Sequence, residues 1–143
     1  MQLHPAQKRI IFGLVCATCL VAVCFLLLPR TLTSYFDLSE PPDTGSVLLL
    51  YPTEEHKQVD LYDETELNQL WTAIQNTKVH YAGQGDTFSC DYLYLVHVQS
   101  SKTQGYISFD YSDSGHLLFN ERKYQITSGK DELLQAIESI LKK

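Results

Sequence analysis

Cysteine is rare in the chain. Only four of the 143 residues are cysteine, and Cys16, Cys19 and Cys24 lie inside one apolar stretch, which leaves Cys90 alone in the rest of the sequence. A single thiol cannot form a disulfide within its own domain. The sequence therefore predicts a fold without disulfides, and the roughly 110 residues beyond the apolar stretch are enough for one compact core.

Positive charge is also scarce, and it is unevenly placed. The chain has 17 Asp and Glu against 11 Lys and Arg, and every acid lies beyond Pro29. Because Lys8, Arg9 and Arg30 flank the apolar stretch, the part beyond Arg30 has 17 acids against 8 bases and a formal charge of −9. A domain with this charge is repelled by phosphate backbones, so we expect no nucleic-acid partner.

The sequence lacks motifs for catalysis and metal binding. No two of the later histidines have a metal-ligand spacing, and no Ser or Cys beside them lies in a nucleophile motif. These histidines are His56, His80, His97 and His116. A dyad of Cys90 with His97 or His80 is an alternative, but Cys90 alternates in phase with Phe88 and Tyr92, which favours a place in the core. We therefore assign no catalytic, cofactor-binding or metal residue, and the pattern favours a protein that is not an enzyme.

The clearest positive feature is an uncharged apolar segment from Ile10 to Leu28. As a helix its nineteen residues span about 28 Å, close to the hydrocarbon thickness of a bilayer. The alternatives are a cleaved signal peptide, a lipidated signal peptide and an uncleaved anchor. The segment is longer than most signal-peptide cores and ends in Leu-Pro-Arg without a small-residue cleavage site, and no Gly, Ala or Ser directly precedes its cysteines. The pattern therefore favours an uncleaved signal anchor.

Basic residues predict the orientation of this anchor. Lys8 and Arg9 precede the segment, a single Arg30 follows it, and basic residues tend to remain in the cytoplasm. The expected segments are a cytoplasmic N-terminus (1–9), a membrane span (10–28), a Pro-containing tether (29–45) and an extracytoplasmic domain (46–143). We thus expect a single-pass protein of the cell membrane, of unknown oligomeric state.

Hydrophobic periodicity predicts one antiparallel sheet and two helices. Alternating or continuous apolar runs between turn residues are typical of strands, and apolar residues at a 3.6-residue period are typical of helices. The strands read in this way are 46–51, 58–62, 78–81, 87–99, 105–111, 116–119 and 123–127. One helix follows Asp63, a suitable cap, and ends near Asn76, and another runs from Lys130 to Lys143. The expected fold class is α+β, with two helices packed on an antiparallel sheet.

One short motif resembles a calcium-binding loop. Asp110, Ser112, Ser114 and Glu121 have the spacing of ligands in a twelve-residue loop, with Gly115 at its turn position. Serine is a poorer ligand than a carboxylate, and both flanks alternate like strands where such a loop needs helices. A hairpin turn with Gly115 at positive φ accounts for the same residues, and we favour the turn.

Tyrosine is the most frequent aromatic residue, with nine copies. Those in predicted strands are Tyr92, Tyr94, Tyr106, Tyr111 and Tyr124. A Tyr side chain suits both a half-buried sheet and a protein-binding surface. Because Tyr is a good strand former, we favour sheet packing.

The C-terminal part contains the runs Gly-Tyr-Ile-Ser-Phe, His-Leu-Leu-Phe and Arg-Lys-Tyr-Gln-Ile-Thr and a Glu-Leu-Leu helix. With the N-terminal anchor and the tether, this pattern resembles the small membrane-attached domains of unknown function in Gram-positive bacteria, including YhfM-like ones. The resemblance covers about Ser46 to Lys143. It implies an envelope protein and assigns no catalytic residue.

Two functions are consistent with these features. The first is a module that binds a protein or peptide at the cell surface, through an exposed strand edge or a Tyr-rich sheet face. The second is an envelope enzyme or ligand-binding domain whose site is assembled from scattered groups such as Asp91, His97 and Asp110. A deep pocket lined by these three side chains would favour the second function, and a closed core with an exposed tyrosine patch would favour the first.

Overall fold

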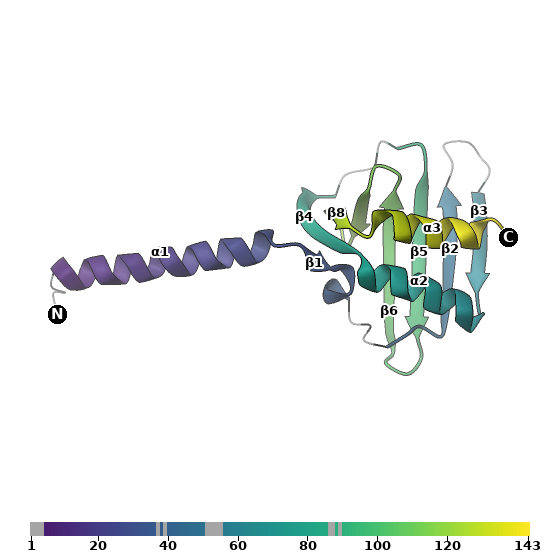
Figure 1. Ribbon diagram of the computed structural model, residues 1–143, viewed down its shortest axis with the longest axis horizontal. Helices are drawn as coiled ribbons and strands as arrows, with labels where there is room; N and C mark the ends of the chain where they lie inside the picture. Colours follow the sequence, from purple (N-terminus) through teal and green to yellow (C-terminus); the bar gives the residue numbers. More distant parts are fainter. Residues whose placement is uncertain (1–4, 37, 39, 51–55, 86–87, 89) are drawn as a thin grey trace.

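The computed structural model describes residues 5–36, 38, 40–50, 56–85, 88 and 90–143 (Figure 1). Within these ranges a long N-terminal helix, α1 (Pro5–Leu27), projects from a domain with one sheet. The strand β1 (Arg30–Thr31) and the 3-10 helix η1 (Leu32–Tyr35) come next. The other elements are β2 (Thr44–Leu50), β3 (His56–Leu61), α2 (Glu64–Asn76), β4 (Lys78–Gln84), β5 (Leu93–Ser100), β6 (Gly105–Ser112), β7 (His116–Phe119), β8 (Arg122–Ser128) and α3 (Lys130–Leu141).

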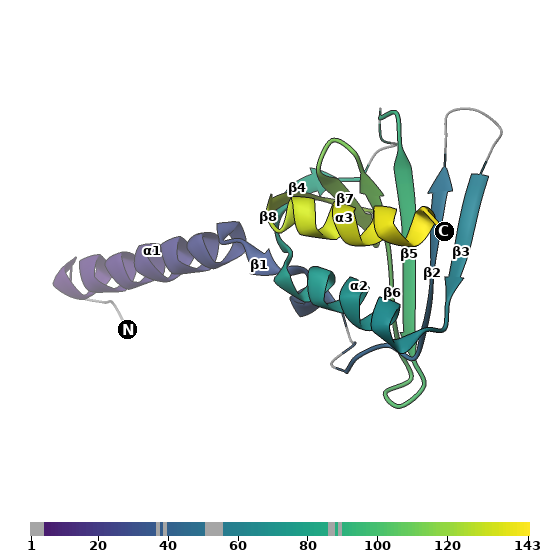
Figure 2. The same ribbon diagram turned by 45° about the vertical axis from the view of Figure 1, so that its right-hand side comes forward.

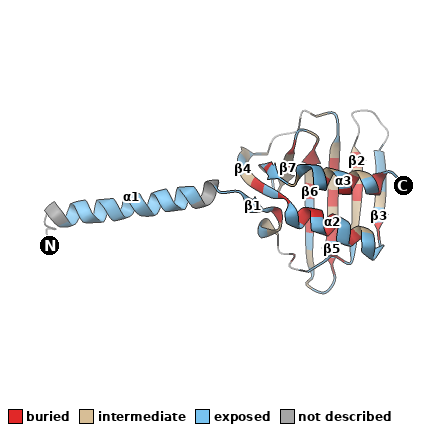
Figure 3. Cartoon of the chain, viewed as in Figure 1, coloured by how far each residue is buried: buried red, intermediate tan, exposed pale blue. Residues whose placement is uncertain are grey.

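Beyond Arg9, helix α1 is apolar on all sides, and its described side chains are exposed (Figure 3). Large side chains such as Phe12 and Leu20 are 72% and 66% exposed. A helix that is hydrophobic all round is suited to an apolar environment. Within the described residues α1 is the one helix long and apolar enough to cross a membrane, a feature that an anchor and a signal sequence share.

The eight strands form one antiparallel sheet in the order β1-β4-β8-β7-β6-β5-β2-β3. This confirms the α+β class with a single antiparallel sheet. The long strand predicted over 87–99 is observed as β5, which begins only at Leu93. Residues 51, 87 and 89 of the predicted strands lie outside the described part of the chain.

Helices α2 and α3 cross the same face of the sheet (Figures 1 and 2). Helix α2 begins where the carboxylate of Asp63 accepts hydrogen bonds from the backbone N–H groups of Thr65 and Glu66, at 3.0 and 3.1 Å. The buried helix residues are Leu67, Leu70, Trp71, Ala73 and Ile74 in α2 and Leu133, Ala136, Ile137, Ile140 and Leu141 in α3. The main core therefore lies between these helices and one face of the sheet.

The segment expected to be a tether contributes to the domain instead. Strand β1 pairs with β4, and the backbone N–H of Leu32 donates to the carbonyl of Thr77 at 2.7 Å. Leu32 and Leu38 are only 1% and 2% exposed. These two core residues could not be predicted, because Pro41 and Pro42 favour a tether and neither leucine belongs to a repeating apolar pattern; only Leu32 lies in the short 3-10 helix. The folded domain therefore begins at Arg30.

The two edges of the sheet lie at different distances from α1. The helix leaves from the β1 edge, and β3 lies at the opposite edge (Figures 1 and 2). Neighbouring strands are about 4.8 Å apart, so seven spacings place β3 about 33 Å from β1. The strand order thus makes β3 the part of the sheet farthest from the helix.

Replacing Leu32 by Ala should lower the free energy of unfolding by about 2–5 kcal/mol, because a fully buried Leu leaves a cavity. Urea unfolding of the full chain in detergent, followed by the fluorescence of Trp71, measures the change. The control is Glu40→Ala, at an exposed position of the same segment, which should change the value by less than about 0.5 kcal/mol. Equally small effects of the two substitutions would contradict a place for Leu32 in the core.

Candidate functional site

Strand β3 is an edge strand that has no neighbour on its outer side among the described residues. Six residue pairs, from Gly45 with Leu61 to Leu50 with His56, join its inner side to β2 without a bulge. The outer side therefore presents N–H and C=O groups that a further strand can bond. Leu49 points to the face covered by the helices, and Lys57, its paired residue on β3, points to the same face. An inward charge of this kind discourages uncontrolled edge pairing.

A hollow of about 530 Å³ lies beside β3, between the sheet and the C-terminal part of α3. We call it the β3 pocket. Lys57, Leu49 and Tyr94 form its sheet side, as one row of paired residues across β3, β2 and β5. The complete lining is Leu49, Lys57, Tyr92, Tyr94, Asp113, Leu134, Glu138, Leu141 and Lys142. Apolar walls with a few polar groups are typical of sites that bind a small molecule or a side chain.

Four charged side chains line the β3 pocket, two of each sign. Lys142 and Glu138 form an ion pair with 3.4 Å between Nζ and Oε2. Lys57 and Asp113 form no ion pair within the described part of the chain. Because Lys57 also belongs to β3, its ammonium can meet an acidic group of a molecule bound along this edge.

Tyr111 lies directly behind the wall of the β3 pocket. Its ring stacks on that of Tyr94, with centroids 5.8 Å apart. The side chain is fully buried, and its hydroxyl has no hydrogen-bond partner among the described residues. Burial raises the pKa of Tyr111 to about 12, and Tyr94 and the carboxylates of Asp131, Asp113 and Glu138 add to the increase. This hydroxyl therefore remains protonated, and its burial without a partner has a cost in stability.

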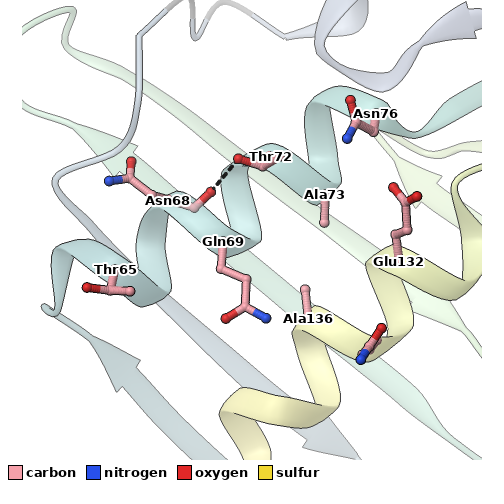
Figure 4. Close-up of a pocket in the computed structure, with 9 residues that line it drawn as sticks. Thr65, Asn68, Gln69, Thr72, Ala73, Asn76, Glu132 and Ala136 are labelled. Carbon is pink, nitrogen blue, oxygen red and sulfur yellow. Dashed lines mark hydrogen bonds between the residues drawn. The ribbon is translucent and has the colours of Figure 1, made fainter.

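A second hollow, of about 470 Å³, follows the seam between α2 and α3 (Figure 4). The small side chains of Ala73 and Ala136 face each other across it and allow the helices to approach closely. Its lining residues are Thr65, Asn68, Gln69, Thr72, Ala73, Asn76, Glu132, Gln135 and Ala136. The hydroxyl of Thr72 donates to the backbone carbonyl of Asn68 at 2.8 Å. Exposed amides and hydroxyls are satisfied by water, so we assign no chemistry to this groove.

The three scattered polar residues of the second sequence hypothesis do not share a pocket. Asp110 lines a hollow of about 380 Å³ on the face of the sheet opposite α2 and α3, and neither Asp91 nor His97 lines it. His97 lies beside the ring of Tyr106, with centroids 6.2 Å apart, and Asp91 is exposed before β5. Burial raises the pKa of Asp110, and the described residues that line its hollow include no His, Cys or Lys.

The residues of the calcium-like motif form a β-hairpin between β6 and β7. Gly115 has φ of +82°, and its N–H donates to the carbonyl of Ser112 at 2.9 Å. The hydroxyls of Ser112 and Ser114 bond to each other at 2.5 Å. Glu121 lies in the next turn and lines the same hollow as Asp110. No group of three or more His, Cys, Asp or Glu side chains within the described ranges is placed to hold a metal ion.

Cys90 and the histidines remain chemically separate. The Cys90 thiol is half buried, burial raises its pKa, and the charges of Asp113 and Asp91 raise it further, so that it forms less of the reactive thiolate. Burial lowers the pKa of His116, and the positive charges of Lys123, His80 and Lys130 add to this. Among the described contacts Cys90 makes no hydrogen bond to a histidine, and the dyad has no support.

The five tyrosines predicted to lie in strands are found in different places: three in the core and two on separate surfaces. Tyr94, Tyr111 and Tyr124 are buried, as sheet packing requires, whereas Tyr92 and Tyr106 are 44% and 66% exposed. Tyr92 lines the β3 pocket and Tyr106 lies on the opposite face of the sheet. These five residues therefore do not form the tyrosine patch that was one candidate binding surface.

Sequence reasoning missed the β3 pocket because its lining comes from five separate segments. One signal was present in the chain: Lys57 alternates in phase with Val59 and Leu61, which places a charge on the apolar side of a strand. Such a position indicates either a guarded edge or a site for an acidic group.

Asp110→Asn should raise the free energy of unfolding at neutral pH, because burial makes the ionised carboxyl costly in the folded protein. The gain should shrink as the pH falls through the raised pKa of the folded carboxyl and should vanish below about 4, where the carboxyl is protonated in both the folded and the unfolded chain. Urea midpoints measured across this pH range test it, with Asp91→Asn at an exposed position as the control. A gain that does not change with pH would contradict the burial of a charge as its cause.

Tyr111→Phe should raise the free energy of unfolding by about 1 kcal/mol, because the substitution removes a buried hydroxyl without a partner and keeps the ring. The comparison is Tyr106→Phe, where the hydroxyl belongs to an exposed side chain and little change is expected. Both values come from urea unfolding of the full chain in detergent. A loss of stability in Tyr111→Phe would mean that the hydroxyl is hydrogen bonded in solution.

Comparison of the chain with protein-family models, with curated proteins and with solved structures finds no match. The function is therefore argued from the helix, the sheet edges and the β3 pocket alone.

Proposed function

We propose that this chain is a single-pass membrane protein whose extracytoplasmic domain binds an extended peptide segment of a protein partner along β3. The observation that carries the proposal is the regular outer edge of β3, which pairs with no other strand in the described part of the chain. Every second residue of this six-residue strand directs its N–H and C=O groups outward, so a bound segment can form several main-chain hydrogen bonds, which is the basis of binding by strand addition.

The β3 pocket supports this function because it adjoins the same edge. A strand added to β3 directs alternate side chains to the face that carries Lys57. Leu49, Leu134 and Leu141 provide apolar walls there, and Lys57 provides one positive charge. The preferred segment therefore has an apolar residue and an acidic residue two positions apart, so that both side chains reach this face.

Helix α1 supports the anchoring part of the proposal. Its length and apolar surface suit a bilayer, and Lys8 and Arg9 before it favour a cytoplasmic N-terminus. In this orientation the domain lies outside the cytoplasm, and β3 is its most distant strand from the membrane. Protease treatment of intact cells tests the orientation, because a protected C-terminal domain would reverse it.

Selection of a displayed random peptide library against the full chain in lipid nanodiscs tests the binding function. We expect enriched peptides to carry an apolar residue and an acidic residue at positions i and i+2, and to slow hydrogen exchange at the amides of His56–Leu61. Lys57→Glu should weaken their binding by about tenfold or more, since it replaces attraction by repulsion.

The matched control is Lys102→Glu, which makes the same change of charge in the exposed turn between β5 and β6 and should leave binding unchanged. Peptides that bind Lys57→Glu as well as the unaltered chain, or that protect α2 and α3 rather than β3, would reject the edge as the binding site.

A further inference from the structure

The charge of the sheet differs between its two ends. The four strands nearest α1, which are β1, β4, β8 and β7, contain no acid, although the part of the chain beyond Arg30 has a formal charge of −9. Their basic residues are Arg30, Lys78, Arg122 and Lys123, together with His80 and His116. We call these strands the α1-side strands. Glu121, in the turn between β7 and β8, is the one acid that directly joins two of them.

The α1-side strands lie close to the end of the helix. Only Leu28 and Pro29 separate α1 from β1, and two residues span no more than about 7 Å. Thr31 of β1 is paired directly with Lys78 of β4. If α1 crosses a bilayer, the basic strands therefore lie at the level of the lipid headgroups.

Part of the positive charge of the α1-side strands lies around His116. Lys123, His80 and Lys130 are all close enough to His116 to disfavour its protonated form. His80 and His116 are both paired with Gln125 of β8, one from each side. Like-charged groups held together in this way are stabilised by an anionic partner.

Tyr81 adds a group typical of membrane interfaces. It lies in β4, is 48% exposed and packs edge-on against Tyr124, with ring centroids 6.0 Å apart. A tyrosine with an apolar ring and a polar tip suits the headgroup region of a bilayer. The same edge of the domain therefore offers both positive charge and an interfacial aromatic ring.

We propose that the α1-side strands dock on the anionic phospholipid headgroups of the membrane that holds α1. Each Lys or Arg near such a surface strengthens attachment by about fivefold, whereas the acidic remainder of the domain is repelled. Docking then fixes the sheet upright, with β3 directed away from the bilayer. This inference rests on the membrane insertion of α1 in the proposed function.

The test uses the full chain reconstituted into vesicles of phosphatidylcholine alone or with added phosphatidylglycerol, each with dansyl-labelled headgroups. Trp71 is the only tryptophan, and it lines a hollow with Thr31 of β1, so energy transfer from Trp71 to dansyl reports the distance of this edge from the membrane. We expect more transfer with phosphatidylglycerol than without it, and loss of the difference in high salt.

The triple substitution Lys78→Gln, Arg122→Gln and Lys123→Gln should abolish the lipid-dependent difference. The matched control replaces Lys102, Lys142 and Lys143 by Gln, which removes the same charge from positions outside the α1-side strands, and should retain the difference; circular dichroism verifies that both variants fold. Equal transfer in the two kinds of vesicle, or equal loss in the two variants, overturns the docking.

Flotation separates the two proposals. A chain that fails to float with either vesicle contradicts the anchor itself, whereas a chain that floats with both but shows equal transfer contradicts only the docking.

Discussion

The pairing of β1 with β4 is the interaction on which the arrangement of the molecule depends. It begins at Arg30, which only Leu28 and Pro29 separate from the end of α1, and is continued by the hydrogen bond from Leu32 to Thr77. The two-residue connection keeps β1 close to the end of α1, whereas the angle between the helix and the sheet depends on further contacts, such as the proposed docking on lipid headgroups. The position of every other strand relative to α1 follows from this pairing and from the order of the sheet.

The two ends of the sheet consequently meet different surroundings. The first four strands from the helix are basic or neutral, and the last strand, about 33 Å away, has no partner on its outer side among the described residues. A continuous ladder of hydrogen bonds between these ends is a rigid spacer. It would hold a bound peptide at a fixed height above a membrane, which a flexible tether would not do.

Local signals in the sequence predicted the local structure. The cap at Asp63 and the 3.6-residue apolar period after it placed α2, and strict alternation placed β6 and β8. The two-residue strand β1 is too short to show a periodicity. Leu32, three residues after Pro29, is a single apolar residue in the core and belongs to no repeating pattern. The β3 pocket could not be predicted from the sequence for a different reason: Lys57 and Tyr94 come together only through the register of β3 and β5 on β2.

An open edge such as β3 carries the risk of pairing with another copy of itself, and the geometry of the chain limits that risk. Two sheets that join through their β3 edges lie on opposite sides of the junction. Because α1 leaves each sheet at the edge opposite β3 (Figure 1), the two helices of such a pair point away from each other. Copies inserted in one membrane cannot satisfy this arrangement. Membrane insertion of α1 would therefore keep the β3 edge available for a different partner, while Lys57, directed inward at the same edge, adds an electrostatic barrier to pairing between copies.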